Sequence, residues 1–354
     1  MERAVTRLAL VMIARDEARA IARALESARP HVDRMVVLDT GSADDTRAIA
    51  RACGAEVRAF AWRDDFAAAR NAALAHSDAD WNLILDADEW IAGGAEALGA
   101  DTLPAGGGGF LGEVRIESAM DQPGAEGVAQ SWIARVLPRG VHYAGRIHEQ
   151  PDSALPRRRL ALVLAHDGYA AAQLARKGDR NEALLMAELQ AKPQDAYLWF
   201  QLAKEHQARA RAAQAALCFT EALRLAPSDA PWRHALVVRA LIALKDNSQL
   251  AEALALADAE VAHWPDSPDF YFVIGDLYLE AASQAPERAM AELLPVAESA
   301  WKRCLEIGER PELDGAVAGR GGRMAAHNLA VLYKTLGQAA TAAQYAELAA
   351  KPRS

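Results

Sequence analysis

The sequence has few cysteines and no long apolar run. Its 354 residues include only Cys53, Cys218 and Cys304, which are far apart and form no CxxC pair. This pattern argues against a disulfide framework and favours three reduced core thiols. The first apolar run, residues 8–14, is too short to cross a bilayer, and no small-residue cleavage site follows it. We therefore expect a cytoplasmic chain with no signal peptide and no transmembrane segment.

Positive charge is also scarce. The chain has 39 Lys and Arg against 48 Asp and Glu, a formal net charge of -9. A non-specific nucleic-acid binder usually has a basic surface, so we expect no nucleic-acid partner. This charge still permits a local basic pocket for a diphosphate. The length and the ordinary globular composition favour a two-domain protein that buries a full core.

Residues 1–171 alternate short apolar runs with helical patterns, which is typical of an α/β domain with a mostly parallel sheet. We predict strands over residues 8–14, 35–38, 83–85, 110–116, 132–137 and 160–165, helices over 18–28 and 44–53, and loops over 93–109 and 120–127. Ser42 or Asp44 suits the N-cap of the second helix, and Gly54 suits the left-handed position after it.

Residues 172–354 show no strand signal and consist of alanine-rich helical patterns. Pro193 and Pro227 are 34 residues apart, which is the tetratricopeptide period. The signature positions of this repeat are occupied by Trp199, Leu202, Ala203, His206, Ala215, Phe219 and Ala222. Looser repeats begin near Tyr271 and Leu329, the first with an insertion around residues 283–294. We predict an all-α array of stacked helix pairs.

Two carboxylates, Asp86 and Asp88, follow the buried strand predicted over residues 83–85. Side chains alternate along a strand, so both are expected to point the same way. Neighbouring carboxylates are costly without a positive partner, and Mg²⁺ and Mn²⁺ prefer oxygen ligands. The plain alternative is a solvated turn or a helix N-cap, and a bare D-x-D pattern does not decide between the two.

Three further motifs precede this one and change the balance. The four lie in chain order as Arg15-Asp16-Glu17, Asp39-Thr40-Gly41-Ser42, Trp62…Phe66…Ala69-Arg70-Asn71 and Leu85-Asp86-Ala87-Asp88-Glu89. Over residues 7–170 the chain therefore resembles the GT-A fold of family 2 glycosyltransferases. With its helical array it also resembles bacterial peptide S-glycosyltransferases, in which the helical part can mediate dimerisation.

The resemblance implies roles for single residues. Ala14, Arg15 and Glu17 would border the nucleotide. Asp39 would hydrogen-bond the base, commonly uracil, because a carboxylate accepts from the N3–H group. Each of these roles has a plainer alternative; Asp39, for example, would simply cap the helix that follows it.

The same resemblance places the charged residues around the diphosphate. Arg70 would face the nucleotide or its diphosphate, Asp86 the ribose or the metal, and Asp88 would ligate the Mn²⁺ or Mg²⁺ ion. The plainer alternative for Arg70 is a surface pair with Asp64 or Asp65. His166, at the end of an apolar run, is the candidate for an additional metal ligand.

An inverting transfer needs a base that takes the proton of the acceptor. Glu149 is the first candidate and Asp121 the second, because the usual acidic base motif of the family is not evident here. We therefore expect an inverting, metal-dependent hexosyltransferase that uses a nucleotide-sugar donor, with UDP as the favoured nucleotide. The acceptor would be a peptide, a protein or a glycan, and the helical repeats would form a homodimer.

Two other classes of function compete with this expectation. The first is an inactive GT-A domain attached to repeats that act as a protein-binding scaffold, against which the intact Asp86 and Asp88 speak. The second is a nucleotidyltransferase on a similar α/β fold. That class usually has a glycine-rich phosphate loop after the first strand, whereas residues 14–17 contain no glycine.

Overall fold

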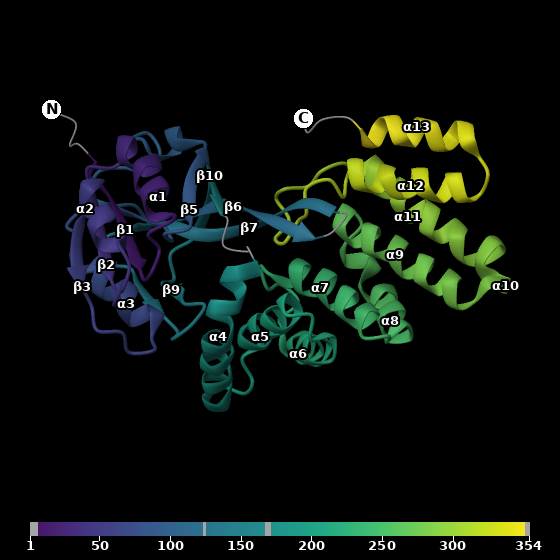
Figure 1. Ribbon diagram of the computed structural model, residues 1–354, viewed down its shortest axis with the longest axis horizontal. Coiled ribbons are helices and arrows are strands. Elements are labelled where there is room, and N and C mark those ends of the chain that lie inside the picture. Colours follow the sequence, from purple (N-terminus) through teal and green to yellow (C-terminus); the bar gives the residue numbers. More distant parts are fainter. Residues whose placement is uncertain (1–5, 123–124, 167–170, 351–354) are drawn as a thin grey trace. The chain divides into compact units, whose positions relative to one another are not determined.

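The computed structural model describes residues 6–122, 125–166 and 171–350, with side chains described outside residues 119–127 and 167–179. The chain forms two compact units (Figure 1). Unit 1 comprises Met1–Asp121 and Ser131–Leu184, and unit 2 comprises Gln122–Gln130 and Leu185–Ser354. None of the helices within the described residues combines the length and the apolar character that a bilayer crossing requires.

Unit 1 is built on an eight-stranded sheet in the order β3-β2-β1-β4-β7-β6-β10-β5. Its strands are β1 (Leu8–Ala14), β2 (Arg34–Asp39), β3 (Glu56–Ala59), β4 (Trp81–Ile84), β5 (Glu89–Gly93), β6 (Leu111–Gln122), β7 (Ala125–Pro138) and β10 (Arg157–His166). Strands β3, β2, β1 and β4 are parallel, as are β6 and β10, whereas β7 and β5 pair antiparallel with β4 and β10. A mostly parallel GT-A-like sheet is thus confirmed.

Apolar residues lie on both faces of this sheet, which explains the continuous apolar run of β1. Leu10 and Met12 pack in one core cluster with Ile21 and Leu25, while Val11 packs in the other. Helices and short elements of unit 1 are α1 (Ile21–Ala28), η1 (Arg29–His31), α2 (Thr46–Ala52), α3 (Phe66–Leu74), η2 (Ala95–Leu98) and the small sheet of β8 (His142–Ala144) and β9 (Gln150–Asp152). A strand covered on both faces has no polar side to alternate with.

The predicted helix ends are correct in part. Gly54 follows α2 at φ +86°, as expected for a left-handed position. The residue at the N-cap of α2 is Asp45, not Ser42 or Asp44, and its side chain makes no capping bond. The carboxylate of Asp44 nevertheless accepts from the backbone N–H of Thr46 at 3.0 Å, so it satisfies one free donor of the first turn from outside the helix.

Both predicted loops contain regular structure. Residues 120–122 belong to β6 and residues 125–127 to β7, and the two strands form a long hairpin. The range 93–109 contains η2 and packs against the sheet. Trp81 Nε1 donates to the carbonyl of Pro104 at 2.9 Å, and a Cβ on Gly108 would lie 2.4 Å from the Trp81 ring. Glycine at position 108 thus permits close packing and does not mark a mobile segment.

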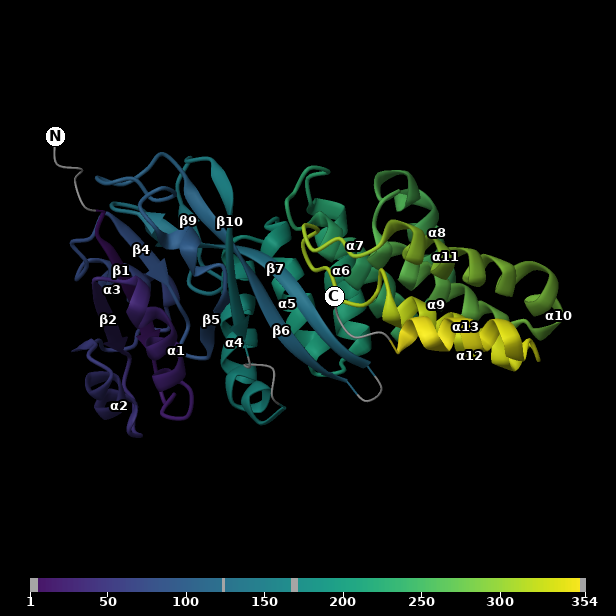
Figure 2. The same cartoon turned by 90° about the horizontal axis from the view of Figure 1, so that it is seen from above.

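Unit 2 is a succession of helices that pack in neighbouring pairs, as the repeat pattern predicts (Figure 2). They are α4 (Ala171–Ala191, whose last turns belong to this unit), α5 (Ala196–Ala208), α6 (Ala212–Leu225), α7 (Arg233–Asp246), α8 (Leu250–Glu260), η3 (Val261–His263), α9 (Pro268–Gln284), α10 (Pro286–Arg288), η4 (Ala289–Leu293), α11 (Leu294–Ile307), α12 (Arg323–Thr335) and α13 (Ala339–Ala349). The predicted insertion after α9 contains α10 and the π-helical turn η4.

The tip of the β6–β7 hairpin belongs to unit 2. The backbone of Gln130 bonds to Ala316 at 2.8 Å and to Gly315 at 3.0 Å, and the N–H of Ala318 donates to the carbonyl of Val128 at 2.9 Å. The predicted division between residues 171 and 172 stays a prediction. The compact units differ from it, because the hairpin tip belongs to unit 2 and the first part of α4 to unit 1.

The contact between Gly275 of α9 and Trp301 of α11 generates a prediction about stability. A Cβ on Gly275 would lie 2.3 Å from Trp301 Nε1, and Trp301 is almost fully buried. We expect Gly275→Ala to lower the free energy of unfolding by about 1–3 kcal/mol through overpacking. Urea denaturation measures this loss. In a double-mutant cycle with Trp301→Phe, the two losses should be clearly non-additive, and strict additivity would contradict the packing explanation.

Candidate active site

A buried ion-pair network surrounds Asp86 at the end of the sheet. Asp86 Oδ1 accepts from Arg70 Nη2 at 2.7 Å, and Oδ2 accepts from Arg135 Nη2 at 2.7 Å. Arg135 Nη2 also donates to Glu89 Oε1 at 2.6 Å, and Arg70 Nε donates to Glu149. The five side chains therefore form one chain of alternating charge, from Glu149 through Arg70, Asp86 and Arg135 to Glu89.

The electrostatics of this network follow from its burial and its pairing. Burial favours a neutral Asp86, but Arg135 and Arg70 outweigh it and hold the pKa of Asp86 far below its ordinary value. Burial dominates at Glu89, whose pKa is raised above the ordinary value despite Arg135. The pKa values of both arginines are raised, because the carboxylates more than offset the burial that disfavours their charge.

Helix α3 delivers Arg70 to the network. Its N-cap Asp65 accepts from the N–H of Ala68 at 2.8 Å, which fixes the start of the helix. The next residue after Arg70, Asn71, pairs with the backbone of Tyr143 in β8. Asn71 Nδ2 donates to the Tyr143 carbonyl at 2.9 Å, and Oδ1 accepts the Tyr143 N–H at 2.7 Å. The amide side chain thus binds β8 as a neighbouring strand would, and it brings the Tyr143 ring to 5.5 Å from Arg70 Cζ.

A second group of side chains lies around Asp88. Its Oδ2 atom is 3.6 Å from His166 Nε2, and Ser118 Oγ lies 3.1 Å from the other ring nitrogen of His166. Burial disfavours the imidazolium, but Asp88 outweighs it and raises the pKa of His166 above its ordinary value. Within the described residues, no group of three or more His, Cys, Asp or Glu side chains is arranged to hold a metal ion.

The loops after β1 and β2 are joined by hydrogen bonds. Ser42 Oγ accepts from the N–H of Asp16 at 3.0 Å, and Thr46 Oγ1 accepts from the N–H of Glu17 at 2.8 Å. Asp39 is buried, and its carboxylate accepts from the N–H of Ser42 at 3.2 Å. These bonds account for the serine and aspartate of the second motif. Asp39 thus orders the turn after β2 and is not the N-cap of α2, which is Asp45. Its carboxylate keeps lone pairs for a ligand.

The remaining residues of the first motif lie around this junction. The carbonyl of Ala14 at the end of β1 accepts from the N–H of Thr40 at 2.9 Å. Arg15 is half exposed, with Nε 3.7 Å from Asp16 Oδ2. The candidates for nucleotide contact thus meet at the carboxyl ends of β1 and β2, where parallel α/β sheets commonly bind ligands.

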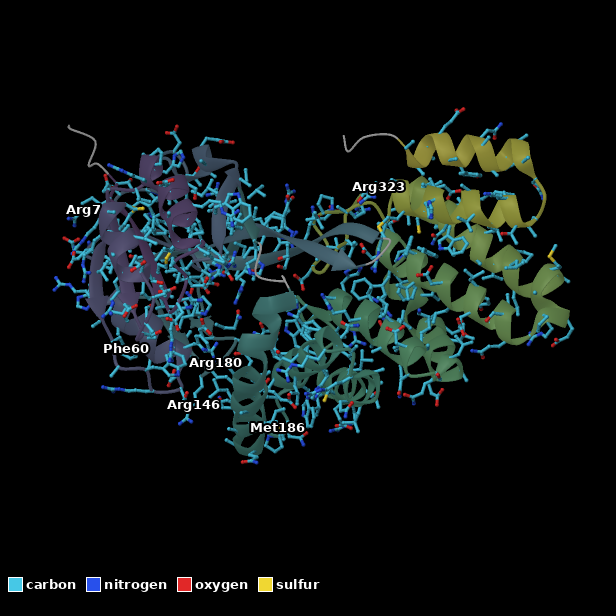
Figure 3. The ribbon with its side chains drawn as sticks, viewed as in Figure 1. Arg7, Phe60, Arg146, Arg180, Met186 and Arg323 are labelled. Atoms are coloured by element: carbon cyan, nitrogen blue, oxygen red, sulfur yellow. The ribbon has the colours of Figure 1, made fainter. Side chains whose placement is uncertain are left out.

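The aromatic pair of the third motif lies at the start of α3. Trp62 and Phe66 make an edge contact with ring centroids 4.8 Å apart, and the Arg180 guanidinium of α4 lies 5.1 Å from the Phe66 ring. The N–H of Phe66 donates to the carbonyl of Arg146 at 2.8 Å, so Arg146 and Arg180, which are labelled in Figure 3, both contact Phe66. The motif anchors α3 one turn before Arg70.

Several site expectations from the sequence need correction. Asp86 and Asp88 lie in the turn between β4 and β5, where strand alternation does not apply, and their carboxylates reach different partners. The plainer alternative for Arg70, a surface pair with Asp64 or Asp65, is wrong, because Arg70 is buried and binds Asp86 and Glu149. Asp121 lies in β6, and its side chain is outside the described residues.

Sequence reasoning missed the roles of Arg135 and Glu89 in this network and the position of Tyr143 beside it. Arg135 had a detectable signal, because it is the one charged residue in the apolar run 132–137 that was predicted as a strand. A charge on a buried strand requires a partner of opposite sign. Glu89 is part of the fourth motif, but its side-chain partner Arg135 comes from a distant segment of the chain. Tyr143 lies beside Arg70, which is likewise distant in sequence.

Residues 9–96 match the model of the family described as "Glycosyl transferase family 2". A TPR repeat-containing protein of Synechococcus elongatus is 34% identical over 222 residues, which cover 55% of this chain and 51% of that protein. An uncharacterized glycosyltransferase of Rickettsia felis is 37% identical over 83 residues, 23% of this chain and 29% of that protein. The chain thus spans about half the length of the first of these curated relatives and less than a third of the second.

Two solved structures show partial likeness. Glucosyl-3-phosphoglycerate synthase from Mycobacterium tuberculosis is 26% identical over 32% of this chain and 43% of its own, with a TM-score of 0.26. MamA from Desulfovibrio magneticus is 17% identical over 49% of this chain and 86% of its own, with a TM-score of 0.38. The match at residues 9–96 and the repeat-containing relative agree with the fold of each unit. The chain therefore combines an N-terminal glycosyltransferase family 2 domain with C-terminal tetratricopeptide repeats.

Proposed function

We propose that this protein is an inverting, metal-dependent glycosyltransferase that uses a nucleotide-sugar donor, with UDP as the nucleotide. The observation that carries the proposal is the approach of Asp88 and His166 beside the Asp86 network, in a family 2 domain. In such a domain, this end of the sheet is where the donor and its diphosphate would bind. Manganese or magnesium is the cofactor that these ligands suit.

The residues at Asp88 fit a divalent cation of this kind. A carboxylate and an imidazole suit Mn²⁺, and Mg²⁺ is usually held by one or two carboxylates together with substrate phosphates and water. Two protein ligands are therefore enough when the donor supplies the rest. Ser118 would accept the Nδ1–H of a neutral His166 and so direct Nε2 towards the ion. When bound, the ion would stabilise the negative charge of the leaving nucleoside diphosphate.

Asp86 has a different part in the proposal. Both of its oxygens are bound by guanidinium groups, so Asp88 and His166 are the stronger candidates for metal ligands. Its side chain is 34% exposed, which leaves an edge open to the ribose of the donor. Asp39, in the turn after β2, is the proposed partner of the uracil N3–H.

The next part of the proposal concerns the catalytic base and the acceptor. Glu149 binds Arg70 and its side chain is nearly buried, so acting as a base would require it to leave this ion pair. A thiol acceptor would ask less of a base, because thiolate forms near neutral pH. We propose a peptide, protein or glycan acceptor. A scaffold without activity is the second candidate, since the repeats alone would suit protein binding.

Donor binding by the wild-type protein is the first test. We expect UDP-sugars to raise the melting temperature in the presence of Mn²⁺ or Mg²⁺ because a ligand that binds only the folded state stabilises it by mass action. A panel of UDP-, GDP- and TDP-sugars, each with metal or with EDTA, is followed by thermal shift and by release of the nucleoside diphosphate. The proposal fails if the metal makes no difference with any donor. Binding without any turnover, even with peptide and glycan acceptors, would favour the scaffold.

The two aspartates of the D-x-D motif should respond differently to substitution. Asp88→Asn is expected to raise the Kd of UDP with Mn²⁺ at least tenfold, since it removes a charged ligand of the ion (about 1.4 kcal/mol). Asp86→Asn is expected to lower the free energy of unfolding by about 2 kcal/mol, less than for a fully buried pair because Asp86 is 34% exposed. Calorimetric titration and urea denaturation measure the two effects.

A surface variant provides the control for this comparison. Asp78 pairs with Arg7 and Arg34 at exposed positions, so Asp78→Asn should change neither the nucleotide affinity nor the stability by much. If Asp88→Asn binds UDP with Mn²⁺ as tightly as the wild type does, the proposed metal site is wrong.

A further inference from the structure

Three buried polar groups in and beside the Asp86 network have no hydrogen-bond partner among the described residues. One is Arg135 Nε, whose guanidinium already binds Asp86 and Glu89 through Nη2. The other two are the Nη1 atom of Arg70 and the hydroxyl of Tyr143. Both side chains are more than nine-tenths buried, with 7% and 6% of their surface exposed. A buried donor without a partner costs free energy comparable to a lost hydrogen bond, so such groups call for an occupant.

The side chains of Arg70 and Tyr143 lie next to each other. The Arg70 guanidinium lies 5.5 Å from the Tyr143 ring, and Asn71 fixes the backbone of Tyr143 beside α3. Burial raises the pKa of Tyr143 to about 12, so its hydroxyl keeps its proton at neutral pH. Asp86, which binds the same guanidinium, is the partly exposed member of the network. A ligand at Asp86 would therefore meet two donors next to it, the Nη1–H group of Arg70 and the hydroxyl of Tyr143.

The charges around these donors indicate what kind of oxygen they suit. Arg70 and Arg135 are the cations of the network, and they face the carboxylates of Asp86, Glu89 and Glu149. Two positive charges against three carboxylates leave no surplus positive charge. A further phosphate would meet net repulsion here, whereas a neutral hydroxyl oxygen would not. The donors therefore favour a hydroxyl group of a sugar over the diphosphate.

We infer that Arg70 Nη1 and the Tyr143 hydroxyl form the subsite that recognises a hydroxyl group of the donor sugar. This inference depends on the proposed function, since it names the part of the donor that the pair contacts. It assigns Tyr143, which lies outside the segment matched to family 2, as a residue that determines sugar binding. It also moves Arg70 from the diphosphate to the sugar, because its charge is already neutralised by Asp86 and Glu149.

The test compares UDP with UDP-glucose, UDP-galactose and UDP-N-acetylglucosamine on the full chain with Mn²⁺. Tyr143→Phe removes only the hydroxyl and keeps the ring. For the sugar nucleotide that the wild type binds best, the variant should raise the Kd about five- to tenfold, the effect of one lost hydrogen bond. The Kd of UDP should stay within about twofold. Calorimetric titration gives both values.

The melting temperatures of the variants show whether the Tyr143 hydroxyl contacts a ligand or stabilises the fold. Among the described residues the Tyr143 hydroxyl has no partner, so Tyr143→Phe should leave the melting temperature unchanged or slightly raised. Tyr333 is the matched control, because its hydroxyl donates to Glu298 at 2.5 Å in unit 2. Tyr333→Phe should lower the melting temperature and leave the affinities for UDP and the UDP-sugar unchanged.

The outcomes distinguish the two proposals. If Tyr143→Phe weakens UDP and the UDP-sugar equally, or weakens neither, the sugar subsite is wrong while nucleotide binding stands. If Tyr143→Phe lowers stability and leaves the affinities alone, the hydroxyl serves the fold, for example through a buried water, and the inference is overturned. If the wild type binds neither UDP nor a UDP-sugar with metal, the proposed function fails and the subsite falls with it.

Discussion

The pairing of Asp86 with two buried guanidinium groups is the constraint on which the rest of the site depends. Arg70 comes from α3, Arg135 from β7 and Asp86 from the turn between β4 and β5. A charge buried without its partner is strongly unfavourable, so none of these elements can occupy its place without the others. The network thereby fixes the helix, the strand and the turn with respect to one another. Both oxygens of Asp86 are engaged by guanidinium groups, whereas the carboxylate of Asp88 lies 3.6 Å from His166.

Much of unit 1 could be predicted because its signals are local. The run from Leu8 to Ala14 is a strand with the predicted limits, and Gly54 ends a helix at positive φ as glycine commonly does. The tetratricopeptide pattern was equally readable, since small residues such as Ala203 and Ala222 must be buried where helices approach closely. In each case the neighbouring sequence alone determines the conformation.

The site was harder to predict, because its contacts join segments that are distant in sequence. Strand alternation placed Asp86 and Asp88 on one face, but the chain leaves the strand at Ile84 and turns. Glu149 was predicted to be the catalytic base, which stays a prediction, but its ion pair with Arg70, 79 positions before it in the chain, could not be foreseen. A sequence shows that a carboxylate is present, whereas its partner depends on the tertiary fold. Arg135 is the exception, since a single charged residue in an apolar strand already indicates that a partner of opposite charge must lie nearby.

The hairpin tip has a consequence for how the protein is made. The backbone N–H and C=O of Gln130 form hydrogen bonds with Ala316 and Gly315. These two residues leave the ribosome long after Gln130. Until then this edge of β7 lacks its partners, and a nascent chain that already contains the whole sheet still has an open strand end. Unit 2 also includes residues Gln122–Gln130, which are synthesised before β8, β9 and β10 of unit 1. Unit 2 is therefore not built only from the chain that follows unit 1, since it also needs a segment that the ribosome makes before the last strands of unit 1.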